Sequence, residues 1–322
     1  MWQDRDKLGF ELQTPELRQL RYVVEVAQQR NFTRAAERLH VAQQALSAQV
    51  KVVEEQLGVT LFLRTNRGVE LTPAGAVFVQ EARRVINGAE RLVTRTQAAA
   101  KGQAGSVRLA YTLTCVYETL PAIVDRLAQR SPDLELQLRE VFGGEVEALL
   151  SEGRHDLALC PRTELSRGMR RQELRREPFV VALSVNHPLA TRPELALGDL
   201  EGELFELWPR DMAPGFFDAV IAACRDAGFE PRRDEHAAGS TVWRSIARGK
   251  GVALVVRSLI DQLPRGVALV ALVDPAPALT LDLVWHEQSL SPTVQRVIEA
   301  ARAVSLERRW LAGDAGPQPR AA

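Results

Sequence analysis

The sequence predicts a chain of two parts, a small α-helical domain at the N-terminus and a larger α/β region joined to it by a long helix. Apolar residues recur at helical spacing over residues 17–57, and a second helical run covers residues 74–100. From residue 107 onward, short apolar strands alternate with helical segments, which is typical of α/β proteins. A length of 322 residues also exceeds one typical domain.

The N-terminal part is predicted to hold two short helices joined by a tight turn. We expect a first helix to begin at Pro15 with Thr14 as its N-cap, and a second helix to have Thr33 as its N-cap. Small residues at 35 and 36 allow close helix crossing. A third helix from about residue 43 carries a buried stripe at i, i+4, i+7 and i+11, formed by Leu46, Val50, Val53 and Leu57.

The opposite face of the third helix is polar but not densely charged, with Gln43, Gln44, Ser47 and Lys51. Such a face can enter the major groove of DNA. Residues 61–62 and 69–71 then flank a basic tip, as in a winged hairpin. The pattern therefore predicts an α-helical winged helix-turn-helix; a helical bundle with a merely solvated polar face is the alternative.

This run resembles the N-terminus of LysR-type bacterial transcriptional regulators. The matching segments include Leu17-Arg18-Gln19-Leu20-Arg21-Tyr22, Asn31-Phe32-Thr33-Arg34-Ala35-Ala36, Ala45-Leu46-Ser47, Leu61-Phe62, Arg67-Gly68 and Leu71-Thr72-Pro73-Ala74-Gly75. So many residues at fixed spacing are far more specific than a helix-turn-helix alone. The resemblance implies a sequence-specific, DNA-binding transcriptional regulator.

Residues 74–100 are predicted to form a long linker helix that pairs with a second copy of the chain. Its expected seam recurs at steps of three and four: Val79, Ala82, Ile86, Ala89, Val93 and Thr96. A helix packed on its own domain is the alternative. Pairing is favoured because the flexible run Lys101-Gly102-Gln103-Ala104-Gly105-Ser106 follows directly, and in the family this helix makes the dimer.

From residue 107 the pattern predicts a largely parallel sheet with helices on both faces. Strands are expected at residues 106–111, 134–139 and 156–160, and the strict alternation at 134–139 indicates a half-buried strand. A second unit has expected strands at 179–184, 203–208 and 252–256 and expected helices at 216–227 and 241–247. A strand at 279–285 and a helix at 293–304 end the pattern.

The family resemblance implies that this region is a periplasmic-binding-protein-like sensor of two subdomains, with the chain crossing near residues 162–175 and returning near 279. The expected division is then an extension at 1–14, a DNA-binding domain at 15–73, a linker helix at 74–100 and a hinge at 101–106. Subdomain I takes residues 107–162 and 279–311, subdomain II takes 163–278, and a disordered tail rich in Gly, Pro and Ala takes 312–322. The extension is either ordered or the product of an early start codon.

Candidate DNA-contacting residues fall into two groups. Gln43, Gln44 and Ser47 are expected at base edges, because an amide can bond adenine in a bidentate manner, and Arg67 at the wing is expected in the minor groove or on a phosphate. Thr33, Arg34, Arg64 and Thr72 are expected to hold phosphates. Gln44 stands where Pro is common in the family and Ala48 where Arg is common, so the preferred operator can differ from that of relatives.

Candidate effector-binding residues lie where predicted strands end, because ligands bind outside the carboxyl ends of parallel strands. Hydroxyls of Thr112 and Thr114 beside free backbone N–H groups suit a carboxylate, although one of them serves equally well as a helix cap. The sensor resembles those of regulators of aromatic-compound catabolism, whose effectors are aromatic acids or ring-cleavage diacids. That resemblance maps the pocket onto Thr112, Thr114, Gly143, Pro214 and Phe216, with Arg162 and Arg210 as candidate carboxylate partners. Gly143 replaces a hydroxyl residue of some relatives.

Charge and cysteine content bound the function further. The net charge is zero, yet residues 15–95 hold twelve Lys/Arg against eight Asp/Glu, which gives a modestly basic DNA-binding part. Cys115, Cys160 and Cys224 form no CxxC motif. A redox-sensing regulator acting through Cys115 is one alternative, and a solute-binding protein, which needs a signal peptide and no DNA-binding part, is another.

An enzyme is not expected. GxSxG and metal-ligand clusters are absent, and His155 and Asp156 would point to opposite faces of a strand. We expect no cofactor, no metal and no membrane segment, and a cytoplasmic location. The expected partners are double-stranded operator DNA, a small carboxylate effector, a second copy through residues 74–100 with further association into a tetramer, and RNA polymerase if the protein activates transcription.

Overall fold

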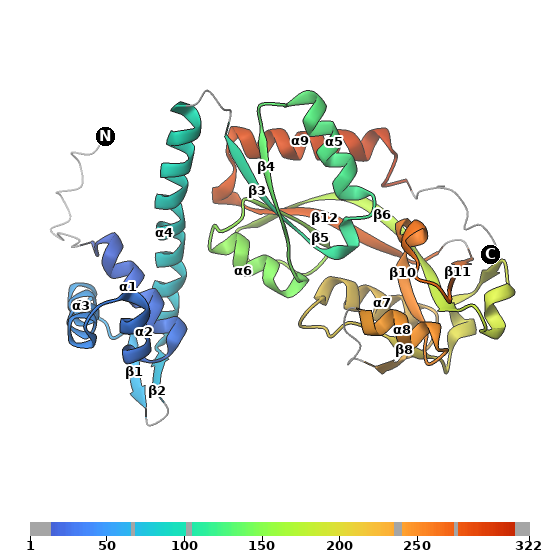
Figure 1. Ribbon diagram of the computed structural model, residues 1–322, viewed down its shortest axis with the longest axis horizontal. Coiled ribbons are helices and arrows are strands. Elements are labelled where there is room, and N and C mark those ends of the chain that lie inside the picture. Colours follow the sequence, from blue (N-terminus) through green and yellow to red (C-terminus); the bar gives the residue numbers. More distant parts are fainter. Residues whose placement is uncertain (1–13, 66–67, 101–104, 235–239, 274–275, 313–322) are drawn as a thin grey trace. The chain divides into compact units, whose positions relative to one another are not determined.

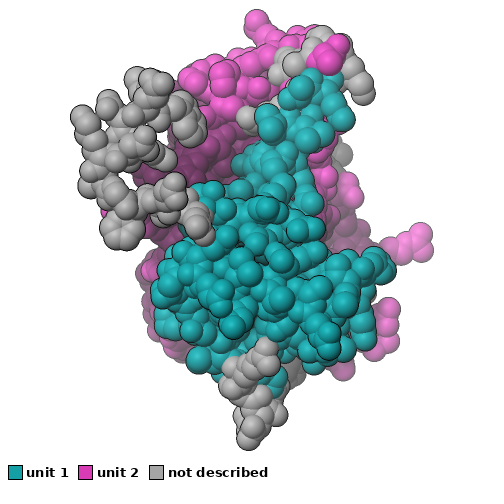
Figure 2. All heavy atoms as spheres, turned by 90° about the vertical axis from the view of Figure 1, so that its left-hand side faces the viewer, with its two compact units in different colours: residues 1–97, 151–153 teal, residues 98–150, 154–322 magenta. Residues whose placement is uncertain are grey.

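The computed structural model describes residues 14–65, 68–100, 105–234, 240–273 and 276–312. Most of the extension at 1–14, most of the hinge at 101–106 and nearly all of the tail at 312–322 therefore lie outside the described residues, as does Arg67. The chain forms two compact units, residues 1–97 with 151–153 and residues 98–150 with 154–322, which Figure 2 shows in two colours. Each unit is described by itself.

The first unit is a winged helix-turn-helix followed by a long helix (Figure 1). Helices α1 (Leu17–Gln29), α2 (Phe32–Leu39) and α3 (Gln43–Leu57) precede an antiparallel hairpin of β1 (Phe62–Thr65) and β2 (Gly68–Leu71). Helix α4 spans Pro73–Ala100. The α-helical winged helix-turn-helix predicted from the sequence is confirmed.

Both predicted N-caps are wrong by two residues. Helix α1 begins at Leu17 rather than at Pro15, and the N–H of its N-cap residue, Glu16, donates to the Gln19 side chain at 2.8 Å. Asn31, not Thr33, caps α2, because its side-chain oxygen accepts from the N–H groups of Thr33 at 2.9 Å and of Arg34 at 3.1 Å. An Asn side chain accepts hydrogen bonds from the free N–H groups of a first helical turn at least as well as Thr does. Asn31 directly precedes α2, whereas Thr33 already lies within the helix.

The core of this unit takes part of the seam expected for pairing. Val79 and Ala82 of α4 are buried with the core of the first three helices, and Ile86 packs against that core. A different face of α4 is apolar and exposed, because Val85 and Leu92, seven residues apart, have 54% and 68% of their surface accessible. The predicted seam is therefore wrong in its first half, since those residues complete the domain's own core.

The second unit is built on one eight-stranded sheet. Strands β3 (Ser106–Tyr111), β4 (Glu135–Glu140) and β5 (Leu157–Pro161) are parallel, with β3 in the middle. Strand β12 (Ala278–His286) then runs antiparallel to both β5 and β6 (Met169–Ser184). Strand β4 is exposed along most of its length because it forms the edge of the sheet, so it is less buried than its alternation predicted.

The far half of the sheet is antiparallel around β6. Strands β10 (Ala253–Val256) and β11 (Val267–Leu272) both pair antiparallel with β6, and the short β7 (Glu194–Leu195) pairs parallel with β11. A separate parallel pair joins β8 (Leu204–Glu206) to β9 (Arg232–Asp234). Within the main sheet, the expected run of parallel strands is therefore correct only for β3, β4 and β5. In that part of the sequence every connection between strands contains a helix, which allows successive strands to run in the same direction.

The α-helices that cover the sheet in the described part of this unit are α5 (Thr119–Arg130), α6 (Val146–Ser151), α7 (Pro214–Asp226), α8 (Ser240–Ala247) and α9 (Pro292–Glu307). Figure 1 shows α5 and α9 together on one face of the first half, with α6 on the other face. The chain passes to the second half along β6, which has sixteen residues, and returns along β12. Strands β6 and β12 pair with strands β5 and β10, which contribute to the two walls of a pocket.

Candidate functional site

The polar residues predicted at the start of α3 lie together on the surface. Gln43 and Gln44 are exposed and Ser47 is half-buried. All three line one surface hollow, whose floor includes Phe32, Val50 and Phe62. Because Leu46, Val50 and Val53 on the opposite side of α3 are buried, the helix has one orientation in its domain and presents these amides outward.

The residues expected on phosphates surround this face with different amounts of freedom. Thr33 is exposed, and the exposed Arg34 donates to the Gln29 carbonyl at 2.9 Å. Thr72 has a structural task, because its hydroxyl donates to the Thr60 carbonyl at 2.7 Å and accepts from the Gly75 N–H at 2.9 Å. The Arg64 side chain and all of Arg67 lie outside the described residues.

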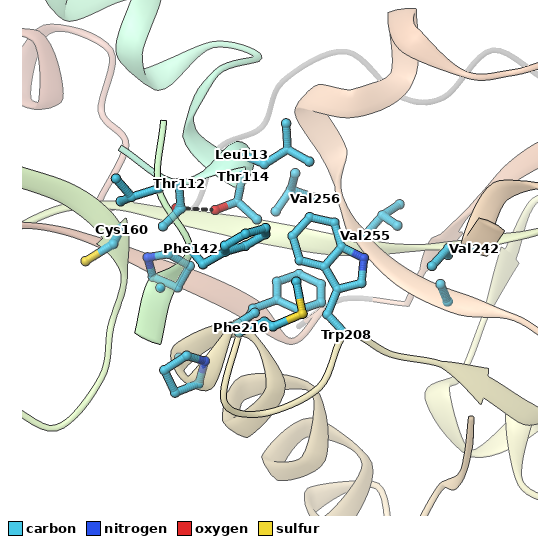
Figure 3. A pocket seen from close by; sticks show the side chains of 18 of the residues that line it. Thr112, Leu113, Thr114, Phe142, Cys160, Trp208, Phe216, Val242, Val255 and Val256 are labelled. Carbon is cyan, nitrogen blue, oxygen red and sulfur yellow. Dashed lines mark hydrogen bonds between the residues drawn. The ribbon is translucent and has the colours of Figure 1, made fainter. Parts of the chain in front are cut away.

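A pocket of about 350 Å³ lies in the second unit (Figure 3). One wall comes from the ends of β3, β4 and β5, and the other from the segment after β8, the first turn of α7, helix α8 and strand β10. The lining is mainly apolar and aromatic, as is usual for small-molecule sites. Its residues include Thr112, Leu113, Thr114, Tyr117, Glu140, Phe142, Gly143, Glu145, Cys160, Glu206, Trp208, Met212, Pro214, Phe216, Val242, Trp243, Val255 and Val256.

Two threonine hydroxyls provide the polar end of the first wall. Thr112 is buried, and its hydroxyl lies 3.1 Å from that of Thr114 (Figure 3). Thr112 precedes the short 3₁₀ turn Leu113–Cys115, but its side chain makes no capping bond to that turn. The capping explanation of Thr112 is therefore wrong, and the hydroxyl pair remains available to a ligand.

The two walls meet closely through glycines and the start of α7. An added Cβ at Gly143 would lie 3.3 Å from the ring of Pro214, and one at Gly215 would lie 2.5 Å from the Arg162 carbonyl oxygen. Phe216 lies against Phe179 of β6 in an edge-to-face contact, with 5.8 Å between ring centres. The structure therefore brings Thr112, Thr114, Gly143, Pro214 and Phe216 to one pocket.

The two arginines expected to bind a carboxylate do not line this pocket. Arg162 donates to both oxygens of Asp282, at 2.9 and 2.8 Å, and to Glu173 at 2.7 Å. Arg210 is exposed and donates to both oxygens of Asp218, at 2.7 and 2.8 Å. Both guanidinium groups are thus bound by carboxylates of the chain itself. The sequence could not show this for Arg162, because its partner Asp282 lies 120 residues away.

The most important lining residue that sequence reasoning missed is Glu206. It ends β8 and has only 4% of its surface exposed. Its one signal in the sequence is a charged residue between Phe205 and Leu207 within an apolar strand. Trp243, Met212 and Val255, which also line the pocket, have the composition of ordinary core residues and gave no signal.

The three cysteines are free and buried. Burial raises the pKa of the Cys115 thiol to about 12, and burial also raises the pKa of Cys160 and, to about 12, that of Cys224. A thiol needs to ionise and to be accessible in order to react with peroxide. The redox-sensing alternative through Cys115 is therefore not favoured.

These features define a DNA-binding regulator with a ligand pocket, and comparisons with known proteins identify its family. Residues 17–76 match the model of the bacterial regulatory helix-turn-helix protein of the lysR family, and residues 100–305 match that of the LysR substrate binding domain. The chain belongs to the LysR family of transcriptional regulators.

Similar curated proteins cover nearly the whole chain. The regulator TfdS of Cupriavidus pinatubonensis is 32% identical over 292 residues, which are 89% of this chain and 98% of TfdS. CatR of Pseudomonas putida is 34% identical over 284 residues, 88% of this chain and 97% of CatR.

Solved structures agree in fold with this chain. The crystal structure of CbnR, a LysR family regulator, superposes with a TM-score of 0.69 at 27% identity and covers 90% of this chain and 99% of its own. Full-length BenM gives a TM-score of 0.58 at 28% identity, with 95% and 99% covered. CbnR has also been solved with its target DNA.

The chain is thus a LysR-type, DNA-binding transcriptional regulator with an effector-binding domain, and not an enzyme. Regulators of this family bind operator DNA and small-molecule effectors, and they oligomerise. Neither a redox-sensing regulator nor a solute-binding protein is favoured. None of the helices in the described part of the chain is long and apolar enough to cross a membrane.

Proposed function

We propose that the first unit reads operator DNA through the start of α3. The observation that supports this is the exposure of Gln43 and Gln44 beside Ser47 on a helix whose other side is buried. The amides contact base edges, at about 1–3 kcal/mol of discrimination for a good bidentate pair. Thr33, Arg34, Arg64 and Arg67 hold the DNA backbone or the adjacent minor groove, and Thr72 fixes the wing to the first turn of α4.

We propose the division of labour along the chain that the sequence predicts. Residues 15–73 form the DNA-binding domain, 74–100 the linker helix and 101–106 the hinge. Residues 107–162 with 279–311 form one sensor subdomain, and 163–278 form the other. The change of partners along β6, from β12 at residues 169–178 to β10 and β11 at residues 179–184, supports a sensor of two subdomains.

We propose that the effector binds in the pocket and that the hydroxyls of Thr112 and Thr114 donate hydrogen bonds to its polar end. Thr112 and Thr114 suit a carboxylate, as in the aromatic or dicarboxylic acids expected from the resemblance to regulators of aromatic-compound catabolism. Gly143, Pro214 and Phe216 shape the apolar remainder of the site. Arg162 and Arg210 take no direct part, because both are held in ion pairs.

We propose that two copies pair through the exposed apolar face of α4 and that pairs associate into a tetramer in the cytoplasm. Ligand binding changes the arrangement of the sensor subdomains and thereby the spacing of the DNA-binding domains on the operator. It acts as a switch only if the ligand binds one arrangement more tightly than the other. Contact with RNA polymerase completes the mechanism if the regulator is an activator.

The DNA-reading proposal is tested with a duplex that the purified protein selects from a random library. Gln43→Ala should weaken binding to that duplex in a gel shift at fixed salt by roughly 5- to 100-fold and broaden the selected sequence. Gln28→Ala, an exposed residue on α1, is the matched control and should leave binding unchanged. Equal affinity of the Gln43→Ala and wild-type proteins would refute the assignment.

A further inference from the structure

The charged side chains on the wall of the effector pocket all have the same sign. Among the described residues that line it, three are carboxylates, Glu140, Glu145 and Glu206, and none is Lys, Arg or His. An effector with only carboxylate groups would therefore enter a site whose formal charge is already negative. That arrangement disfavours dianions and favours a ligand with a positive group.

Of the three carboxylates, only Glu206 is buried. Glu140 and Glu145 are exposed, and Glu145 accepts the Phe142 N–H at 3.1 Å. Glu206 has 4% of its surface exposed, and its backbone N–H donates to the Val252 carbonyl at 2.8 Å, which fixes the end of β8. The strand therefore holds this carboxylate at the pocket rather than at the protein surface.

Among the residues that the structure describes, the Glu206 carboxylate has one hydrogen-bond donor and no cationic partner. The Ser245 hydroxyl of α8 donates to it, and among the described residues no Lys, Arg or His lies within ion-pairing distance. Gly251 packs against it so closely that an added Cβ would lie 3.2 Å from Oε1. A buried carboxylate that keeps no cation of the protein loses hydration without full compensation, and a cationic ligand supplies that compensation.

Aromatic rings line the pocket beside this carboxylate. Trp208 follows Glu206 by two residues, Trp243 precedes Ser245 by two, and Phe216 completes the same wall. Indole and phenyl faces attract ammonium groups as well as aromatic rings. Carboxylate and rings together match an aromatic amine better than an aromatic acid.

We propose that the effector is an aromatic compound with a protonated amino group, which pairs with Glu206. This inference rests on the proposal that the pocket is the effector site. It replaces the plain aromatic or dicarboxylic acid expected from the family resemblance with an aromatic ligand that carries an amino group. In an aromatic amino acid, the carboxylate binds the hydroxyls of Thr112 and Thr114 on the first wall while the ammonium binds Glu206 on the second. Such a ligand satisfies both walls at once.

Three probes of equal ring and chain test the proposal on the full chain: phenethylamine, phenylalanine and 3-phenylpropionate. Thermal-shift and calorimetric titrations at pH 7.5 should show binding of the first two and none of the third. Glu206→Gln retains the shape and the acceptor for Ser245 but removes the charge, and it should weaken both amines roughly 10- to 100-fold. Glu201→Gln, an exposed carboxylate five residues before Glu206 that does not line the pocket, is the matched control and should change either affinity less than about threefold.

The outcomes separate this inference from the proposal beneath it. Binding of 3-phenylpropionate that Glu206→Gln leaves unchanged or improves, and that Phe216→Ala abolishes, would keep the pocket as effector site and overturn the amine. Amine binding that survives Glu206→Gln would also overturn it, as would the failure of both amines at millimolar concentration. Operator binding and the melting temperature of Glu206→Gln without ligand check that this variant folds.

Discussion

Asp282 of the returning strand β12 holds Arg162 at the end of β5 through two hydrogen bonds, of 2.9 and 2.8 Å, and also accepts from Arg171 at 3.3 Å. The carboxylate is almost fully buried, with 1% of its surface exposed. Two segments 120 residues apart are thereby joined beside the pocket. The pair therefore links β12 to the end of β5.

Removing the arginine should cost more stability than neutralising the acid. Arg162→Met leaves a buried carboxylate with Arg171 as its remaining cation and should lower the free energy of unfolding by about 2–4 kcal/mol. Asp282→Asn keeps the shape and an acceptor, and the partly exposed arginines regain water, so about 1 kcal/mol is expected. Urea unfolding of the two variants measures the difference, and a larger loss for Asp282→Asn would contradict this reading.

Gly215 should tolerate no side chain. An added Cβ would lie 2.5 Å from the Arg162 carbonyl oxygen and 2.8 Å from that of Pro161, both backbone atoms. Gly215→Ala should therefore destabilise the sensor by about 1–3 kcal/mol and weaken ligand binding, because α7 must move away from β5.

Gly198 gives the matched control for that substitution. The nearest atom to its added Cβ, the Ala227 carbonyl oxygen, is 3.9 Å away. Gly198→Ala should change the melting temperature little, and equal losses in the two variants would show that close approach is not the cause.

The thiols should be inert in the folded protein. Because burial raises the pKa of Cys115 to about 12, its thiolate is scarce at pH 8. Iodoacetamide followed by intact-mass measurement should label the three cysteines slowly in buffer and fast in denaturant. Rapid labelling of one cysteine in the native protein, or a disulfide after mild peroxide, would restore the redox alternative.

His155 should make the sensor less stable in mild acid. Burial, together with Arg108 and Arg139, lowers the pKa of His155 below its ordinary 6.5, and its buried Nδ1 has no hydrogen-bond partner. The unfolded chain thus binds a proton near pH 6.5 that the folded chain takes up only at lower pH. Stability rises with pH through that window and is lost as pH falls through it.

A substitution isolates this contribution. His155→Gln should flatten the dependence of the unfolding free energy on pH between pH 6.5 and the lower pKa of His155 in the folded protein. At pH 8 the slope of this dependence should be the same in the variant and the wild type. Parallel slopes for wild type and variant over pH 5–7 would assign the effect to other groups.

The exposed face of α4 should govern self-association. Leu92→Glu places a charge on a side chain with 68% of its surface accessible and should convert dimers to monomers in sedimentation. Thr94→Glu, at an exposed position that lies about 160–180° around α4 from Leu92 and Val85, adds a charge away from the apolar face and should leave the assembly unchanged. A dimer that withstands Leu92→Glu would move the interface elsewhere.

The wing should add affinity more than sequence discrimination. Arg67→Ala removes a positive charge from the tip of the hairpin and should weaken operator binding at least about fivefold, with a smaller salt dependence. A gel shift at two salt concentrations measures both effects, and unchanged affinity at fixed salt would refute the role of Arg67.

Local patterns predicted the elements of this chain well, and they predicted long-range strand pairing only for the parallel strands β3, β4 and β5. The stripe of Leu46, Val50 and Val53 gave α3, because helical periodicity is carried by neighbours in sequence. Strands β5 and β12 lie antiparallel, although more than a hundred residues separate them, and no local signal encodes that choice. The same limit applies to the linker helix. Val79 and Ala82 pack into the core of the first three helices, which the sequence of the linker helix alone does not show.

The pocket followed the same rule. Thr112 and Thr114 were predicted to line it because the end of a strand is visible in the sequence, and the family resemblance mapped Pro214 and Phe216 to the same pocket. Glu206 was not, since a glutamate in a strand looks like a solvated residue until burial is known. Arg162 was expected to bind the effector carboxylate because the sequence does not show that it pairs with Asp282.

The sixteen residues of β6 pass unbroken from one half of the sensor to the other. Residues 169–178 pair with β12, and residues 179–184 pair with β10 and β11. The register of β12 against β6 shifts once, between Leu281 and Asp282, which lie opposite Arg175 and Glu173 of β6. Because one unbroken strand carries the chain between the two halves, any change in their relative arrangement has to twist or bend β6 itself, since no loop lies within it to act as a flexible hinge.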